Sequence, residues 1–409
     1  MALELHQESL ARIIRPKDLK AANLIDTASN RAFLAQQARN VVESDFSSLS
    51  LRSLRVRDKT AHSIASAPHA VVINQLNQVI RARTGAKTSD RDTIIRRLAT
   101  ILSEGVPHRV YKFDIKDFYD TVDSRLLADK ILVDNRIPRA SLLLLAQFLT
   151  ELRTKGIKGL PRGIPLSATL AEYALSEFDD FISTLPNVYF YARYVDDIII
   201  VTSGQEDTGP FSKVIRRALP LKLQFNAIKT RRLELPITQQ RATGVAGEID
   251  YLGYRIRVHH AARIDGRLTR VVDLSIATKK LQRIQTRICL SIISYLNTSD
   301  LQTLKRRFQL LTSNYNVRDY STGQIRNVGL YCTYRRMNQT DCLIKLDSFL
   351  RALLLGDKLT LARRLTSSLT LRERQHLLSF SFLTGFKKRL FYNFTAQELA
   401  SLKECWRDV

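Results

Sequence analysis

The chain has few cysteines and no long apolar segment, and both shortages narrow what it can be. Its four cysteines form no CxxC pair, so the sequence predicts neither a zinc site nor a disulfide framework. They are consistent with a reducing compartment, and we expect a cytoplasmic protein. No apolar run reaches the roughly 18 residues that a membrane span needs, and the N-terminus lacks a signal-peptide pattern. We therefore expect no membrane association.

Acidic residues are scarce relative to basic ones. The 409 residues include 64 Lys and Arg against 39 Asp and Glu, a formal net charge of +25. From residue 266 onward, 25 basic residues stand against 10 acidic ones, an excess of 15. Such an excess favours a polyanionic partner, and nucleic acid is the first candidate. From composition alone, the alternative is a basic protein whose charges are scattered over the surface and solvated.

Hydrophobic periodicity predicts an α+β chain. Residues 1–105 are mostly helical in pattern, and residues beyond 261 are almost entirely so. Further helices are expected over 124–151, with a break at Pro138, and over 167–185. The predicted strands span residues 110–113, 188–194, 198–202, 221–225 and 251–258. This order indicates a small sheet backed by helices, followed by a basic helical module.

Carboxylates lie at the ends of two predicted strands, about 80 residues apart. Asp114 ends the first strand, and Asp196 and Asp197 occupy the turn before the aliphatic run 198–201. Charges beside buried strands cost free energy unless they are compensated. Three converging carboxylates would repel one another, and Mg²⁺ is the natural compensator because it prefers hard oxygen ligands. The pattern predicts two Mg²⁺ ions, with Mn²⁺ as a substitute, although Asp is also common in plain surface turns.

Five segments, in order, resemble the motifs of reverse transcriptases. They are FDIKDFY (113–119), GLPRGIPLS (159–167), YVDD (194–197), LQFNAIKT (223–230) and YLGY (251–254). Any one of them could arise by chance, whereas the ordered set is specific. The resemblance implies a right-hand polymerase with fingers, a palm with a small antiparallel sheet, and a helical thumb. We expect the fingers over 1–108, the palm over 109–262, and the thumb with a C-terminal extension over 263–409.

The resemblance also assigns roles to single residues. Asp114, Asp196 and Asp197 match the catalytic, metal-binding carboxylates, and Ile115 matches the residue that lends a backbone carbonyl to one metal. The residues assigned to the nucleotide are Asp117, Phe118, Tyr119, Gly163, Lys229 and, without a motif match, Arg91. The Tyr119 ring is expected to exclude a 2′-hydroxyl and so to favour deoxynucleotides. Core packing for Tyr119 and a solvated surface position for Lys229 or Arg91 are the alternatives.

A third group of residues is assigned to the template and primer. It comprises Arg162, Ser167, Tyr251, Leu252 and Gly253. Two positions depart from the family pattern, because Arg162 replaces the usual Gln and Ala168 replaces the usual Pro. Arginine still hydrogen-bonds a base or a phosphate, but its contact with the template is expected to differ.

The sequence shows no clustered carboxylates for a second nuclease centre and no Cys/His-rich segment. This favours a compact bacterial reverse transcriptase, most similar to the defence-associated enzymes of the type 3 antiphage system, with retron and abortive-infection enzymes as relatives. The expected activity is DNA synthesis from dNTPs on a structured non-coding RNA, with a partner protein or a second copy of the chain left open. The alternatives are template-independent or protein-primed synthesis, and an RNA-binding scaffold with a vestigial site.

Overall fold

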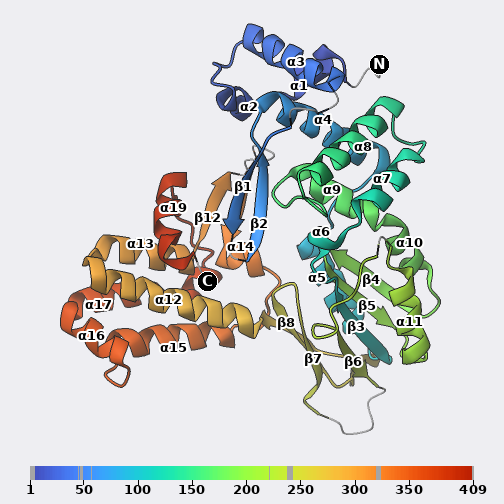
Figure 1. Ribbon diagram of the computed structural model, residues 1–409. Helices are drawn as coiled ribbons and strands as arrows, with labels where there is room; N and C mark the ends of the chain where they lie inside the picture. Colours follow the sequence, from blue (N-terminus) through green and yellow to red (C-terminus); the bar gives the residue numbers. More distant parts are fainter. Residues whose placement is uncertain are drawn as a thin grey trace. The chain divides into compact units, whose positions relative to one another are not determined.

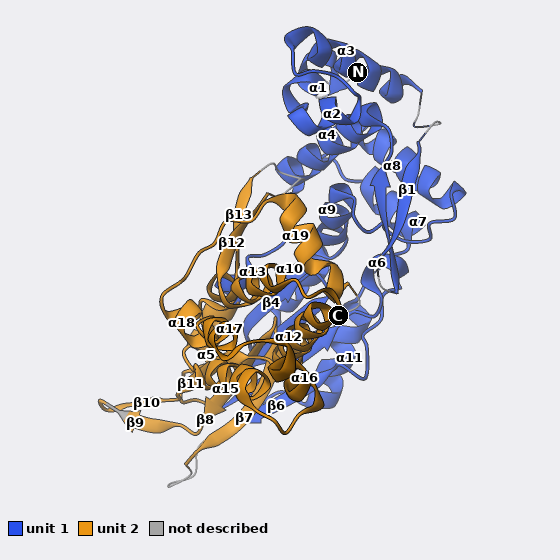
Figure 2. Cartoon of the chain, turned by 90° about the vertical axis from the view of Figure 1, so that its left-hand side faces the viewer, with its two compact units in different colours: residues 1–94, 107–236 blue, residues 95–106, 237–409 orange. Residues whose placement is uncertain are grey.

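The computed structural model describes residues 5–44, 46, 49–56, 58–220, 222–236, 243–318 and 324–407. The chain forms two compact units, the first of residues 1–94 and 107–236 and the second of residues 95–106 and 237–409 (Figure 2). The first unit ends at residue 236, so part of the segment expected as palm belongs to the second unit. The assignment of fingers, palm and thumb stays a prediction. In the described residues, no helix combines the length and apolarity that crossing a membrane requires.

The first unit contains a four-stranded antiparallel sheet in the order β4-β5-β3-β6. Its strands are β3 (His108–Asp114), β4 (Val188–Tyr194), β5 (Asp197–Thr202) and β6 (Arg231–Leu235). The aliphatic residues 198–201 of β5 are fully buried, because β5 lies between β4 and β3 and both of its faces are covered. Helix α10 (Ser176–Thr184) packs on β4, and α11 (Thr208–Ala218) lies beside α10 (Figure 1).

Helices and one hairpin surround this sheet and share its core. The helices are α1 (Gln7–Ile13), α2 (Pro16–Ala21), α3 (Ala28–Glu43), α4 (Ala67–Thr84), α7 (Ser124–Leu132), α8 (Arg139–Thr154) and α9 (Pro165–Ala174). The hairpin pairs β1 (Leu51–Val56) with β2 (Lys59–Ile64). Pro138 is the N-cap of α8, which confirms the predicted break. One apolar cluster runs from Leu5 to Leu223 and ties these elements together.

The second unit is helical but not exclusively so. Its helices are α12 (Thr278–Thr298), α13 (Leu301–Thr312), α14 (Leu330–Tyr334), α15 (Asp341–Leu355), α16 (Thr360–Ser368), α17 (Leu371–Leu378), α18 (Phe382–Lys387) and α19 (Ala396–Lys403). Its strands are β7 (Val245–Tyr251), β8 (Tyr254–His259), β9 (Ala262–Ile264), β10 (Arg267–Thr269), β11 (Val272–Ile276), β12 (Asn314–Arg318) and β13 (Ile325–Gly329). Trp406 anchors the end of the chain, since its indole Nε1 donates to the Arg287 carbonyl at 3.0 Å.

Several predicted elements were wrong. Residues 251–258 are not one strand, because Leu252 and Gly253 adopt positive φ values of 46° and 82° and turn β7 back into β8. Residues 222–225 form no strand; Phe225 makes one isolated bridge to Ile115, and Leu221 lies outside the described residues. The region beyond residue 261 contains short strands, and the first 105 residues contain the β1–β2 hairpin. The helix expected over 167–185 is interrupted at Leu175, between α9 and α10.

Candidate active site

Three carboxylates gather at one end of the β3–β5 strand pair. Asp114, the last residue of β3, pairs in register with Asp197, the first residue of β5. Asp196 precedes it in the turn from β4, and its carbonyl accepts from the Ile115 amide at 3.0 Å. Val195 in this turn has a φ of 60°, a conformation that β-branched residues rarely adopt. The predicted proximity of Asp114 to the Asp-Asp pair is therefore confirmed.

The surroundings of Asp196 and Asp197 disfavour the ionised form of both carboxyl groups. Burial raises the pKa of Asp197 to about 6; the Lys112 charge opposes this shift, and the Asp196 and Asp114 charges add to it. Burial also raises the pKa of Asp196, with Asp114 contributing in the same direction. Both shifts indicate that burial disfavours the ionised carboxylates and that the nearby cations do not fully offset it.

Lys229 supplies part of that positive charge. Its Nζ donates to both Oδ1 and Oδ2 of Asp114 at 2.9 Å, and this hydrogen bonding raises the pKa of Lys229. Lys229 follows the non-helical segment that bridges to Ile115, so the expected lysine does lie beside the carboxylates. The ammonium remains more than half exposed and is free to turn toward a ligand.

The donor set fits a divalent cation. Among the described residues, no three His, Cys, Asp or Glu side chains already form a metal-holding group. The Asp114 carboxylate is directed at Lys229 instead. The chemistry nevertheless matches the binding of a hard cation, because Asp196 and Asp197 provide carboxylate oxygens. A bound cation would favour the ionised carboxylates and so lower the pKa values that burial raises.

Arg193 supports the Asp-Asp turn from behind, and the sequence analysis missed it. Its Nη1 donates to the Val195 carbonyl at 3.0 Å, while Nη2 contacts Glu172 and Asp179 at 2.7 Å each. Arg193 is only 5% exposed, so these two acids hold a buried charge in a fixed direction. An arginine inside an otherwise apolar strand, directly before Tyr194, was the available signal.

A short helix, α6 (Phe118–Thr121), follows β3 and carries the expected nucleotide-binding residues. Asp117 starts it with a φ of 45°, and Phe118 is buried in the core. Lys59, the first residue of β2, pairs with Asp117 and lies 3.2 Å from Asp120, and it lowers the pKa of Asp117. Lys59 is a second residue that the sequence analysis missed, because it lies 58 positions away from Asp117.

The loop before α9 packs against both α6 and β2. Arg162 lies over the Tyr119 ring, with 5.1 Å from its Cζ to the ring centroid, and its Nη2 donates to Asp120 at 3.0 Å. Gly163 has a φ of 93°, and an added Cβ would lie 2.6 Å from the His62 carbonyl. The close approach that requires glycine here is therefore to β2, and the expected nucleotide contact of Gly163 stays a prediction.

The roles of the other predicted site residues stay predictions. Ser167 is 1% exposed in the first turn of α9, and its hydroxyl has no hydrogen-bond partner in the described residues. Arg91 begins α5 (Arg91–Leu102), which Asp90 caps by accepting from the Thr93 amide at 2.8 Å. Tyr251, Leu252 and Gly253 form the β7–β8 turn of the second unit.

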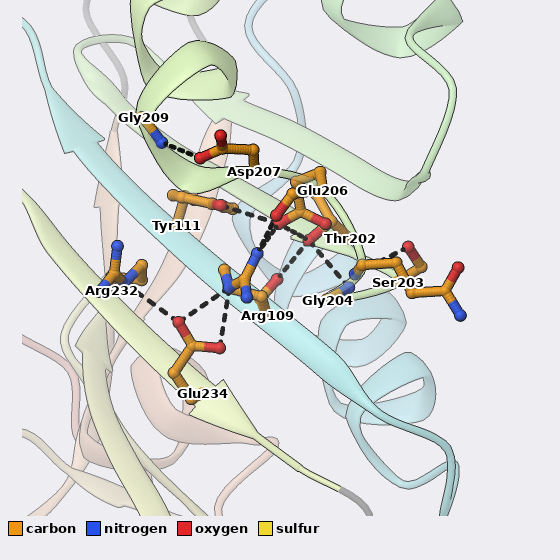
Figure 3. A network of polar contacts seen from close by, with 11 residues as sticks. Arg109, Tyr111, Thr202, Ser203, Gly204, Glu206, Asp207, Gly209, Arg232 and Glu234 are labelled. Atoms are coloured by element: carbon orange, nitrogen blue, oxygen red, sulfur yellow. Dashed lines mark hydrogen bonds and ion pairs between the residues drawn. The ribbon is translucent and has the colours of Figure 1, made fainter.

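The opposite end of the same strand pair carries a closed polar network (Figure 3). The Glu206 carboxylate accepts from Arg109 and Tyr111 at 2.7 Å and from the Thr202 hydroxyl at 2.8 Å. Arg109 also contacts Glu234 at 2.8 Å. Burial opposes ionisation of Glu206, but the bonds from Tyr111, Thr202 and Arg109 outweigh it and lower its pKa. All three of these side chains donate to Oε1, while Oε2 is buried without a hydrogen-bond partner in the described residues.

The first unit thus combines a small antiparallel sheet with converging carboxylates and a lysine at one strand turn. Residues 58–256 match the family described as reverse transcriptase (RNA-dependent DNA polymerase). This segment is therefore similar to the domain of RNA-directed DNA polymerases.

The search of solved structures gave a similar chain in apo telomerase from Candida Tropicalis, truncated from the C-terminal domain. The identity is 14% and the TM-score is 0.37, and the alignment covers 60% of this chain. This chain spans 60% of the length of that telomerase chain. No curated protein matches the sequence.

Proposed function

We propose that the protein is a reverse transcriptase that synthesises DNA on an associated non-coding RNA, in bacterial antiphage defence. The observation that carries the polymerase part is the register of Asp114 opposite Asp197 within the segment that matches the reverse transcriptase family. The RNA template and the defence role rest on the motif resemblance and on the basic last third of the chain.

Asp114, Asp196 and Asp197 would hold two Mg²⁺ ions, or Mn²⁺ in their place, with the carbonyl of Ile115 as a further ligand. When bound, the ions activate the primer 3′-hydroxyl and stabilise the leaving pyrophosphate. Arg193 keeps the Asp-Asp turn in place through the Val195 carbonyl.

Lys229 is the proposed acid for the leaving group. Its ammonium is held by Asp114 in the absence of substrate, and its raised pKa keeps it protonated. Turning from Asp114 to the pyrophosphate would place a proton and a positive charge where negative charge develops. The amides of Asp117 and Phe118 would meet the triphosphate, with Arg91 as a further cation.

The Tyr119 ring is the proposed sugar gate. It is partly buried against the core, so its position is constrained from one side. A bulky ring beneath the sugar would clash with a 2′-hydroxyl, and the product would therefore be DNA.

Template and primer contacts are proposed for the loop at Arg162 and Ser167 and for the β7–β8 turn. The right-hand assignment of fingers, palm and thumb follows the same resemblance. Basic helices of the second unit, including α16 with the exposed Arg363 and Arg364, would contact the RNA through its phosphates. Arg307 of α13 does not belong to this surface, because it is 6% exposed and its Nε donates to the Leu402 carbonyl.

Primer extension tests the proposal. With an RNA template, an annealed primer, dNTPs and Mg²⁺, we expect template-directed incorporation that stops when EDTA is added. Equal incorporation with and without template would instead favour template-independent synthesis. No incorporation under any condition, by a protein that still binds RNA, would favour the scaffold function.

A primer-free reaction separates the remaining alternative. Protein-primed synthesis would give DNA that stays covalently attached to the chain after denaturation, whereas RNA- or DNA-primed synthesis would not. Sequencing the RNA and DNA that copurify with the protein identifies template and product together, and shows whether one structured RNA dominates as proposed.

A further inference from the structure

Arg162 stands at a junction of three chain segments. Its carbonyl accepts from the His62 amide at 2.6 Å, within an isolated bridge to β2 at Ala61. The next residue, Gly163, approaches the His62 carbonyl so closely that a Cβ would not fit. These backbone contacts fix the Cα of Arg162 and limit where its side chain can reach.

The side chain of Arg162 is directed at α6. Its Nη2 donates to Asp120 Oδ2 at 3.0 Å, and its Cζ lies 5.1 Å from the centroid of the Tyr119 ring. The side chain is 29% exposed, and its Nε is buried without a hydrogen-bond partner in the described residues. The guanidinium is thus oriented by one carboxylate and by the face of one ring.

The Asp120 carboxylate is shared by two cations. Lys59 of β2 lies 3.2 Å from it, and Arg162 lies 3.0 Å from it. An ion-pair network that links α6, β2 and the loop before α9 therefore stabilises the contact of Arg162 with Tyr119. A glutamine, the residue that this position usually carries in the family, offers neither the charge nor the planar cation that stacks on a ring.

We propose that Arg162 is a positioning residue for specificity: by stacking on Tyr119 it holds the sugar gate in place and sets the discrimination against ribonucleotides. This inference rests on the proposed function, in which Tyr119 excludes the 2′-hydroxyl. It gives Arg162 a role in addition to the template contact proposed for its loop, because its guanidinium is engaged with Asp120 and the Tyr119 ring. Tyr119 is supported by Phe118 at 5.6 Å between ring centroids, and Arg162 provides a second support.

The test is single-nucleotide incorporation with a dNTP and the matching rNTP, for each of the four template bases. The measured quantity is the ratio of the two kcat/KM values. Arg162→Gln is compared with Arg162→Lys, which keeps the charge, and with Arg125→Gln, which removes one exposed charge from α7. Melting curves establish that each variant is folded.

We expect Arg162→Gln to lower the ratio by roughly three- to tenfold, the range that one cation–π contact can contribute. Arg162→Lys should keep part of the ratio, and Arg125→Gln all of it. In a Tyr119→Ala background, Arg162→Gln should change the ratio no further, because a residue that acts through the ring has nothing left to position.

Three results would overturn the inference. One is an unchanged ratio in Arg162→Gln, with dNTP and rNTP use slowed equally, which would indicate template contact. Another is an effect that persists in the Tyr119→Ala background. The third is a wild-type enzyme that incorporates both nucleotides equally well. A wild-type enzyme that incorporates neither contradicts the proposed function itself, and the two failures are thereby distinguished.

Discussion

The two ends of the β3–β5 strand pair differ in how their charges are compensated. At one end, Arg109 and Thr202 face each other, and Arg109, Tyr111 and Thr202 all donate to Glu206. At the other end, Asp114 faces Asp197, and burial, with a further contribution from like charges, opposes ionisation of the Asp-Asp pair. The first end has a lowered pKa at its acid, and the second has raised ones.

This difference separates charges that stabilise the fold from charges that are kept for a ligand. Acids whose pKa is lowered in the folded protein stabilise it at neutral pH, whereas buried acids whose pKa is raised destabilise it. A fold that retains buried acids with raised pKa values is less stable, but it keeps carboxylates available to bind a ligand. Substitutions at the two ends should consequently change stability in opposite directions.

The largest stability effect is expected at the end that carries Arg109 and Glu206. Glu206→Gln removes a carboxylate that is 6% exposed and accepts from three side chains, so we expect a loss of about 2–4 kcal/mol in the free energy of unfolding. Urea denaturation measures it. Glu234→Gln is the matched control, because Glu234 contacts the same Arg109 but is 49% exposed, and it should cost less than about 1 kcal/mol. Equal losses in both variants would contradict the comparison.

The second largest stability effect is expected at Arg193, which contacts the Asp-Asp turn. Arg193→Lys keeps the charge but loses the fork that reaches Glu172, Asp179 and Val195 together, so we expect a loss of about 1–3 kcal/mol. The same denaturation experiment applies. Arg232→Lys, on the exposed side of β6, is the control and should be neutral. A neutral Arg193→Lys would show that the buried network does not hold the turn.

The end that carries Asp114 and Asp197 should respond in the opposite sense. Burial raises the pKa of Asp197 to about 6, so its ionised form destabilises the metal-free protein at neutral pH. Asp197→Asn should therefore raise the free energy of unfolding by about 1 kcal/mol in EDTA. Asp180→Asn, an exposed position on α10, should leave it unchanged. A destabilised Asp197→Asn would mean that this carboxylate serves the fold after all.

The smallest expected effect is a pH dependence at Glu206. Its pKa is lowered in the folded protein, so its contribution is fully present above the unfolded value of about 4.3 and is lost as the pH falls through the folded value. The difference in melting temperature between wild type and Glu206→Gln should thus be constant around neutral pH and shrink in acid below about pH 4.3. A difference that grows on acidification would contradict this assignment.

The sequence predicted the strands that position the site because their patterns are strong. The four aliphatics after Asp197 and the acidic end of β3 specify a buried hairpin and its neighbour, and β4 was predicted with its observed bounds, Val188–Tyr194. Here the local hydrophobic pattern and the strand pairing of the fold agree, so one sequence is enough to predict these strands.

The parts that were missed depend on contacts between distant residues. Arg193 meets Glu172 and Asp179 only because the chain breaks at Leu175 and starts a new helix. Lys59 reaches Asp117 through the β1–β2 hairpin, whose polar strands lack a clear alternation. The late strands β9 and β10 have three residues each, too few to establish a period.

The most direct test of the central claim is single-nucleotide incorporation on an RNA template by the Asp196→Ala, Asp197→Ala double variant, per folded molecule. The account predicts that incorporation falls by more than about a hundredfold, because these carboxylates bind the catalytic metal ions, whose outer-shell partners alone are commonly worth 10- to 100-fold. It also predicts that the melting temperature does not fall. Incorporation at the wild-type rate by this folded variant would contradict the assignment of the Asp-Asp turn as the catalytic centre.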